Sequence, residues 1–169
     1  MKADFEAVVK RSRTVAEMMS KGVQFLLKKN NVDVINGFGK IVKDKKVEVT
    51  KADGTTETFE AQHIILATGA RSRSLPNVQQ DGKKIIGYRE ALTLPKLPAS
   101  MVVMGSGAIG SELAFFYASM GTKVTIVEYL PNLVPVEDEE ISKQLERSFR
   151  KAGIKTMTSA AVESVDTTG

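Results

Sequence analysis

A short glycine-rich stretch is the part of this sequence best suited to bind a ligand. It follows an apolar run and has the spacing G-x-G-x-x-G. In this motif the first glycine allows a tight turn, the second lets the backbone approach a pyrophosphate, and the third lets a helix and a strand pack closely. Backbone N–H groups at the start of the helix then hold the phosphates. The spacing predicts a dinucleotide-binding loop made of Gly105, Ser106, Gly107, Ala108, Ile109 and Gly110.

Two glutamates near this loop are candidates for contacting the same ligand. Glu128 ends the next apolar run, about 20 residues further on, where an acid can accept hydrogen bonds from the adenosine ribose. No lysine or arginine follows it before Lys143, so we predict a preference for NAD over NADP. Glu112 lies inside the predicted helix, two residues past the last glycine. It is either an ordinary solvent-facing glutamate or a residue beside the nicotinamide, and spacing alone leaves both open.

The segment IILATGA at residues 64–70 is a second candidate site. It predicts a buried strand that runs into Thr68 and Gly69, where the chain can turn and offer backbone groups to a ligand. An ordinary strand followed by a turn explains the same pattern. His63, directly before the segment, is interpreted as a structural residue.

Composition excludes several kinds of chemistry. The chain of 169 residues has no cysteine and one histidine, so it forms no disulfide and offers no thiol nucleophile or thiolate metal ligand. We therefore predict no metal site. No apolar run approaches the roughly 20 residues of a membrane span, and the N-terminus lacks the apolar segment of a secretory signal. We expect a cytoplasmic protein without a membrane partner.

The net charge of +4 is unevenly distributed, because the excess of lysine and arginine falls in the first hundred residues. A basic surface can bind nucleic acid. These lysines are scattered over predicted helix and hairpin positions without aromatic residues between them, which is more typical of a solvated basic face. We expect no nucleic-acid partner.

The first 70 residues predict a long helix followed by strands. Apolar residues recur at steps of three, four and seven over residues 4–29, which is the period of a helix. Asp53 and Gly54 predict a hairpin turn between two of the strands. The meander is predicted to end in a buried strand at residues 64–67. Its β-rich runs are VDVING, GKIV, KVEVT, TETFEA and HIILAT.

The second half predicts a different architecture. Prolines and glycines punctuate residues 71–100, and a domain boundary is placed there. The order beyond it is βαβαβ, so the fold class is α/β, with a right-handed parallel sheet and a Rossmann-like dinucleotide-binding unit. The expected elements are strand 101–105, helix 108–120, strand 123–128, helix 138–152 and strand 154–157.

Together these segments resemble the flavoprotein disulfide reductases. The segments concerned are IILATGA, EALTLPKLP, VVMGSGAIGSELA and VTIVEYLPNLVP, and within the family they are most similar to the dihydrolipoyl dehydrogenases. The resemblance covers nearly the whole chain. It implies that residues 1–95 are part of an FAD-binding domain and residues 96–169 the N-terminal half of an NAD-binding domain. It also implies a homodimeric enzyme that passes electrons from dihydrolipoamide, or a lipoyl-bearing protein, through a disulfide and FAD to NAD.

The resemblance assigns four residues of the first half to FAD. Gly39, in the segment NGFGKI, matches a backbone contact to the adenosine part of the flavin cofactor. Thr68, Gly69 and Ala70 match flavin-binding positions. The long helix and the antiparallel meander are then the remaining parts of this FAD domain.

In the second half, the resemblance implies contacts with NAD. Residues 105–112, including Ser111, match the pyrophosphate loop. Glu128 matches the ribose acid, and Val162 matches a contact near the adenine. Glu112 matches a glutamate beside the nicotinamide, which favours its functional interpretation.

The sequence also departs from the family pattern. The family's glycine-rich FAD strand, its C-x4-C redox pair and its His-Glu dyad have no counterpart in these residues. Ala108 is smaller than the valine or tyrosine often found at its position, which affects the gate of the nicotinamide pocket. The chain therefore resembles an internal piece of the enzyme, without catalytic residues and not expected to retain FAD. Two alternatives stay open: another disulfide reductase of the family, and a nucleotide-binding module without chemistry.

Overall fold

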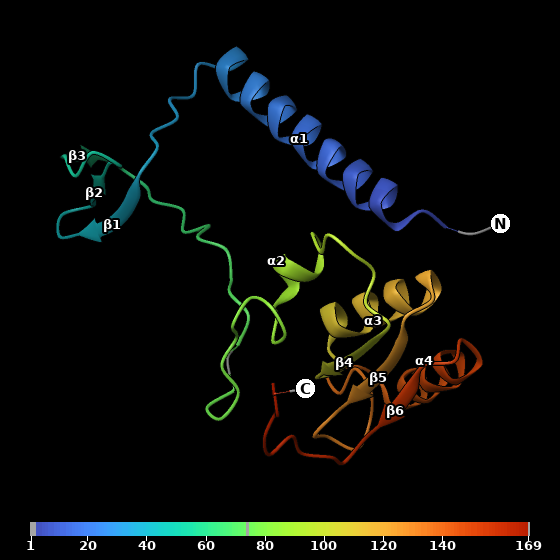
Figure 1. Cartoon of the computed structure of the whole chain (residues 1–169). Coiled ribbons are helices and arrows are strands. Elements are labelled where there is room, and N and C mark those ends of the chain that lie inside the picture. Colours follow the sequence, from blue (N-terminus) through green and yellow to red (C-terminus); the bar gives the residue numbers. More distant parts are fainter. Residues whose placement is uncertain (1–2, 74, 169) are drawn as a thin grey trace. The chain divides into compact units, whose positions relative to one another are not determined.

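The computed structural model describes residues 3–73 and 75–168, which divide into two compact units. One unit comprises residues 1–12 and 72–169, and the other comprises residues 13–71. The first contains a parallel sheet with helices, and the second contains a small antiparallel sheet (Figure 1). The expected boundary near residue 95, which separates the two cofactor domains of the family, stays a prediction.

The long N-terminal helix is confirmed as α1, Phe5–Lys29. Its start is capped because Asp4 Oδ1 accepts a hydrogen bond from the N–H of Ala7 at 3.1 Å. Its end is marked by Asn31, which adopts the left-handed conformation with φ of 56°. Phe5 is buried, whereas the apolar side chains between Val15 and Leu26 are exposed. None of the described helices is long and apolar enough to cross a membrane.

The predicted hairpins form a three-stranded antiparallel sheet in the order β1-β2-β3. The strands are β1 Phe38–Val42, β2 Lys46–Thr50 and β3 Thr56–Glu60. The turn predicted at Asp53 and Gly54 joins β2 to β3. Gly54 has a φ of 83°, and Asp53 Oδ1 accepts hydrogen bonds from the N–H and hydroxyl of Thr55 at 2.9 and 2.6 Å. An Asp-Gly pair suits this turn because glycine adopts positive φ without a steric penalty.

Two predicted strands are not formed. Both lie within the described residues but have no regular secondary structure: the run VDVING at residues 32–37 and the run at residues 64–67. Ile65 and Leu66 were expected to be buried, yet their side chains are 91% and 70% exposed. A strand needs a neighbour to pair its backbone N–H and C=O groups. Among the described residues no strand pairs with either run, so β-propensity alone does not produce a strand there.

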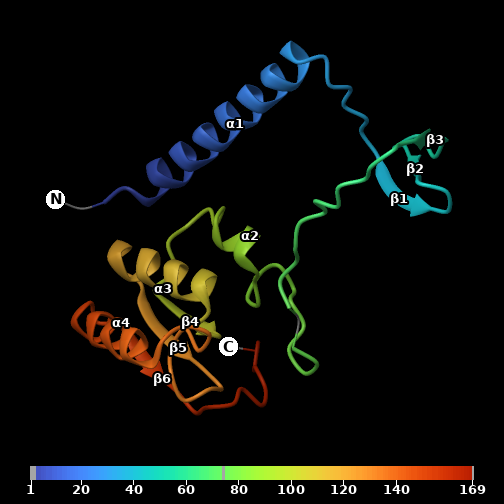
Figure 2. The same cartoon turned by 180° about the vertical axis from the view of Figure 1, so that it is seen from behind.

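The βαβαβ order is confirmed in the larger unit. A short helix, α2 Tyr88–Ala91, precedes it. The elements that follow are β4 Ser100–Met104, α3 Ala108–Met120, β5 Lys123–Val127, α4 Glu139–Lys151 and β6 Lys155–Met157. The strands form a parallel sheet in the order β4-β5-β6. Both views show α3 and α4 lying against this sheet (Figures 1 and 2). The α/β fold class predicted from the sequence is therefore correct.

The hydrophobic core of this unit lies among α3, β5, α4 and the first turn of α1. The Phe5 ring packs 6.2 Å from Phe116 and 6.0 Å from Tyr117, measured between ring centres. Gly121 ends α3 in the left-handed conformation, with φ of 105°. The core residues are Phe5, Ala91, Ala114, Tyr117, Val124, Ile126, Leu133, Phe149 and Ile154.

We expect Tyr117→Phe to lower the free energy of unfolding by about 1–3 kcal/mol, the cost of leaving a buried polar group unpaired. The Tyr117 hydroxyl is fully buried and donates a hydrogen bond to the Ala91 carbonyl, which ties α3 to α2. Tyr129→Phe is the matched control, because the Tyr129 side chain is exposed. Urea denaturation measures both variants. Equal stabilities of the two would contradict a structural role for the buried hydroxyl.

Candidate functional site

The glycine loop connects β4 to α3 and lies against the end of β5. The N–H of Gly105 donates to the carbonyl of Val127 at 2.8 Å, and Gly105 has a φ of 92°. A Cβ on Gly110 would lie 2.3 Å from the Gly105 carbonyl oxygen. Both positions therefore require glycine for reasons internal to the protein: a left-handed turn at the first, and close helix–strand packing at the third.

Gly107 differs from the other two glycines. A Cβ added to it would meet nothing within 4 Å, so no neighbouring protein atom excludes a side chain there. Gly107 is also the N-cap of α3, which has no side-chain cap and no acidic residue in its first turn. The first N–H groups of a helix lack partners within the helix and carry a partial positive charge. The start of α3 is thus open to an anion, and this supports the predicted phosphate contact.

Glu128 is buried at the end of β5 and joined to the glycine loop. Its Oε2 accepts hydrogen bonds from the N–H of Ser106 at 2.8 Å and from the Ser106 hydroxyl at 2.7 Å. Its Oε1 accepts from the N–H of Leu130 at 2.9 Å. Burial alone would raise the pKa of Glu128, but the hydrogen bonds from Leu130 and Ser106 outweigh it and hold the pKa below its ordinary value. The carboxylate is therefore ionised at neutral pH.

The chain beyond β6 runs beside Glu128. The N–H of Glu128 donates to the carbonyl of Met157 at 2.8 Å, and the N–H of Ala160 donates to the carbonyl of Glu128 at 2.9 Å. Val162, predicted near the adenine, follows two residues later and is half-buried. Its carbonyl accepts a hydrogen bond from the Asn77 side chain at 3.4 Å. Val162 thus follows the Ala160 contact with Glu128 along the chain, and its place near the adenine stays a prediction.

The remaining predicted residues of the NAD site lie on α3. Ala108, Ile109 and Glu112 are exposed at its start, and Ser111 is buried with its hydroxyl donating to the Ser106 carbonyl at 2.9 Å. The exposed position of Glu112 is compatible with both interpretations of it.

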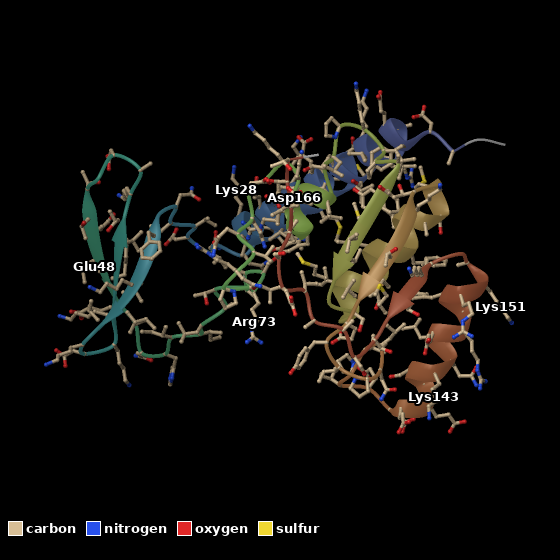
Figure 3. The ribbon with its side chains drawn as sticks, turned by 60° about the horizontal axis from the view of Figure 1, so that its bottom comes forward. Lys28, Glu48, Arg73, Lys143, Lys151 and Asp166 are labelled. Atoms are coloured by element: carbon tan, nitrogen blue, oxygen red, sulfur yellow. The ribbon has the colours of Figure 1, made fainter. Side chains whose placement is uncertain are left out.

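Lys143 on α4 is the first lysine or arginine after Glu128 in the sequence. Its ammonium lies 2.6 Å from the Glu139 carboxylate, and its side chain points outward from the helix (Figure 3).

The four residues predicted to contact FAD belong to the other unit. Gly39 is exposed in β1, opposite Val49 of β2. Thr68, Gly69 and Ala70 are exposed in an irregular segment, where Gly69 has a φ of 73°. The positive φ at Gly69 is one that glycine adopts without a steric penalty, but the segment forms neither a turn nor a bend there, so the predicted sharp turn is not formed. No group of three or more histidine, aspartate or glutamate side chains that could hold a metal ion occurs in residues 3–73 and 75–168.

Sequence reasoning missed two side chains in this region. Ser106 was predicted only as part of the loop backbone, yet its hydroxyl contacts Glu128. Asn77, which binds the carbonyls of Val162 and Glu163, was not singled out. A hydroxyl residue between the first two glycines was a visible signal for Ser106. The sequence carries no such signal for Asn77, because its contacts lie 85 and 86 residues away along the chain.

Comparison with known proteins connects this geometry to a family. The sequence pattern of the family described as pyridine nucleotide-disulphide oxidoreductase matches residues 1–169. A dihydrolipoyl dehydrogenase of Chlorobaculum parvum is 49% identical over 162 residues, covering 96% of this chain and 34% of that protein. The crystal structure of LpdA from Mycobacterium tuberculosis superposes with a TM-score of 0.90 at 32% identity, covering 100% of this chain and 38% of that one.

A second solved structure is a different member of the same broad group. It is the Cu(II) complex of a cysteine-to-serine mutant of the flavoprotein disulfide reductase RclA of Escherichia coli, with a TM-score of 0.86 and 26% identity, covering 97% of this chain and 37% of that one. This chain therefore spans about a third of the length of the relatives that it matches. The same fold also serves reductases with different names.

We expect Gly110→Ala to destabilise the protein by about 1–3 kcal/mol, the usual cost of overpacking, although alanine is the better helix former. The new Cβ would press on the Gly105 carbonyl, a backbone atom that cannot rotate away. Gly107→Ala is the matched control, because its Cβ enters open space and its φ of −60° suits alanine. Its stability should stay within about 0.5 kcal/mol of the wild type. Thermal unfolding compares them, and similar losses in both would contradict the distinction between the glycines.

Proposed function

Because the chain belongs to the pyridine nucleotide-disulphide oxidoreductase family, we propose that its parallel-sheet unit binds NAD as part of a dihydrolipoyl dehydrogenase. The observation that carries the proposal is the pairing of an open helix start with a buried carboxylate. The uncapped first turn of α3 suits a diphosphate, and Glu128, anchored to the same loop, suits the ribose that follows it. A dinucleotide contains both groups, whereas a simple phosphate ligand would not need the carboxylate.

The charge at this site supports NAD over NADP. Glu128 carries a negative charge at neutral pH, and the causes that set its pKa are burial and hydrogen bonds rather than a paired cation. The 2′-phosphate of NADP would bring about −1.5 to −2 charges to this carboxylate. The 2′-hydroxyl of NAD can instead donate a hydrogen bond to it.

We propose that the other unit contributes to an FAD site through Gly39 and the segment Thr68–Ala70. The support is the exposed, irregular segment around Gly69, whose positive φ leaves backbone groups available to a ligand. NAD and FAD supply hydride transfer when bound, and the residues of this chain bind and orient them. Glu112, exposed at the start of α3, is proposed to lie beside the nicotinamide ring.

The proposal extends to the whole enzyme. It would be a homodimer of the cytoplasm that accepts electrons from dihydrolipoamide or a lipoyl-bearing protein and passes them through a disulfide and FAD to NAD. These points are supported by similarity to proteins named dihydrolipoyl dehydrogenase, which are about three times the length of this chain. The thiol substrate is supported by the names of the relatives alone, because this chain has no cysteine disulfide that could accept its electrons.

We expect the chain to bind NAD at least about tenfold more tightly than NADP, a difference of 1.4 kcal/mol or more. Glu128→Gln should shrink that ratio, because it keeps the shape of the side chain and removes the charge. Calorimetric titration of the chain with each nucleotide measures the two affinities and hence the ratio. Glu137→Gln removes the same charge from an exposed neighbouring site and should leave the ratio unchanged. An unchanged ratio in Glu128→Gln would remove this carboxylate from the selectivity.

We expect the chain by itself to show no dihydrolipoamide-linked reduction of NAD. No residue of its sequence can form the thiol–disulfide couple, since it has no cysteine. Absorbance at the NADH band, with FAD, NAD and dihydrolipoamide added, should follow the uncatalysed rate. A complete dihydrolipoyl dehydrogenase in the same assay is the positive control. Turnover clearly above background would show that the chain holds chemistry that its residues do not reveal.

A further inference from the structure

We propose that Ser106 is a positioning residue, whose hydroxyl fixes the Glu128 carboxylate and thereby sets how the loop distinguishes a ribose 2′-hydroxyl from a 2′-phosphate. The inference rests on the proposed nucleotide site and adds a specific role for a side chain within it. Ser106 is fully buried, so its hydroxyl serves protein atoms rather than solvent. It lies between the first two glycines. Phosphate binding by the loop uses backbone N–H groups, so it places no requirement on the side chain at this position.

The first argument is the number of acceptor positions on Glu128. A carboxylate accepts about four hydrogen bonds, two at each oxygen. Ser106 occupies both positions of Oε2, one through its N–H at 2.8 Å and one through its hydroxyl at 2.7 Å. The N–H of Leu130 occupies one position of Oε1 at 2.9 Å. The backbone N–H of Tyr129 also contributes a hydrogen bond to this carboxylate. Because Ser106 takes up Oε2, a ribose hydroxyl would approach Glu128 through Oε1.

The second argument is that the hydroxyl joins three segments. Besides donating to Glu128, Ser106 Oγ accepts a hydrogen bond from the N–H of Val134 at 3.2 Å, and the Ser106 carbonyl lies 3.1 Å from the same nitrogen. Val134 has a φ of 41°, which is rare for a β-branched residue and strained. The bonds to Ser106 hold it there. The glycine loop, the end of β5 and the segment at residues 129–138 are therefore fixed to one another through this serine.

The hydroxyl also stabilises the charge of the carboxylate. Burial raises the pKa of Glu128, and the hydrogen bond from the Ser106 side chain is one of those that lower it again. The groups that set this pKa are backbone N–H groups of Ser106, Tyr129 and Leu130 and the Ser106 hydroxyl, without a charged side chain among them. Removing the hydroxyl should therefore raise the pKa of Glu128 and loosen its rotamer.

The test compares Ser106→Ala with Ser142→Ala in the full chain. Both changes remove a buried hydroxyl, but Ser142 Oγ has no hydrogen-bond partner in the described part of the chain. Without nucleotide, the carboxyl carbon of Glu128 is titrated with pH by NMR. We expect a higher pKa in Ser106→Ala and the wild-type pKa in Ser142→Ala. This measurement does not depend on NAD, so it stands even if the proposed function fails.

With nucleotide, the NAD-to-NADP affinity ratio should fall at least about threefold in Ser106→Ala, as expected when one charge-assisted hydrogen bond is lost, and stay unchanged in Ser142→Ala. If Ser106→Ala does not fold, Ser106→Cys replaces it, because a cysteine has a similar shape and its S–H is only a weak donor. The pKa of Glu128 should also rise in Ser106→Cys. A Glu128 titration that is identical to wild type overturns the proposal. So does a raised pKa with an unchanged affinity ratio, since that assigns the serine to stability alone.

Discussion

The close approach of α3 to β4 is the constraint on which the rest of the binding unit depends. At Gly110 the helix backbone comes so near the turn at Gly105 that no side chain fits between them. This contact places the first turn of α3 directly after β4, at the end of the parallel sheet where ligands bind in open α/β folds. It also aims the unpaired N–H groups of the helix at the space beside Gly107. The geometry of one pair of backbones thus creates the position proposed to bind the pyrophosphate.

Glu128 extends this constraint from the loop to the next strand. Because β5 pairs in parallel with both β4 and β6, Glu128, the residue that follows its last one, emerges beside the glycine loop. The carboxylate then bonds Ser106 on one side and Leu130 on the other. A buried carboxylate is costly unless it accepts enough hydrogen bonds. Here the same bonds that stabilise its charge also fix its position, so its electrostatic and geometric roles have one physical origin.

The sequence predicted the parts of the molecule that are determined locally. Apolar periodicity located α1, α3 and α4, and the glycine spacing located the loop, because each depends on residues that are near in sequence. Strand prediction failed at residues 32–37 and 64–67, because strand formation depends on a partner that a local pattern does not reveal. The same limit, that local patterns do not reveal contacts between distant segments, decides which residues of the candidate site were predicted. Gly105, Gly110 and Glu128 were predicted from spacing, whereas the contact of Asn77 with Val162 joins distant parts of the chain.

The architecture of the site explains what the chain contributes chemically. Its main recognition elements are backbone N–H groups and one ionised carboxylate, which bind and orient a ligand but do not supply an electron or a mobile proton. Glu128 has a lowered pKa and accepts hydrogen bonds from Ser106, Tyr129 and Leu130, so it is a poor general base near neutral pH. The Ser106 hydroxyl donates to Glu128 and the Ser111 hydroxyl donates to the Ser106 carbonyl, so neither hydroxyl is paired with a base that would activate it as a nucleophile. The described residues therefore suit the binding and orientation of a cofactor, as proposed, and the reactivity of such a site would come from the cofactor.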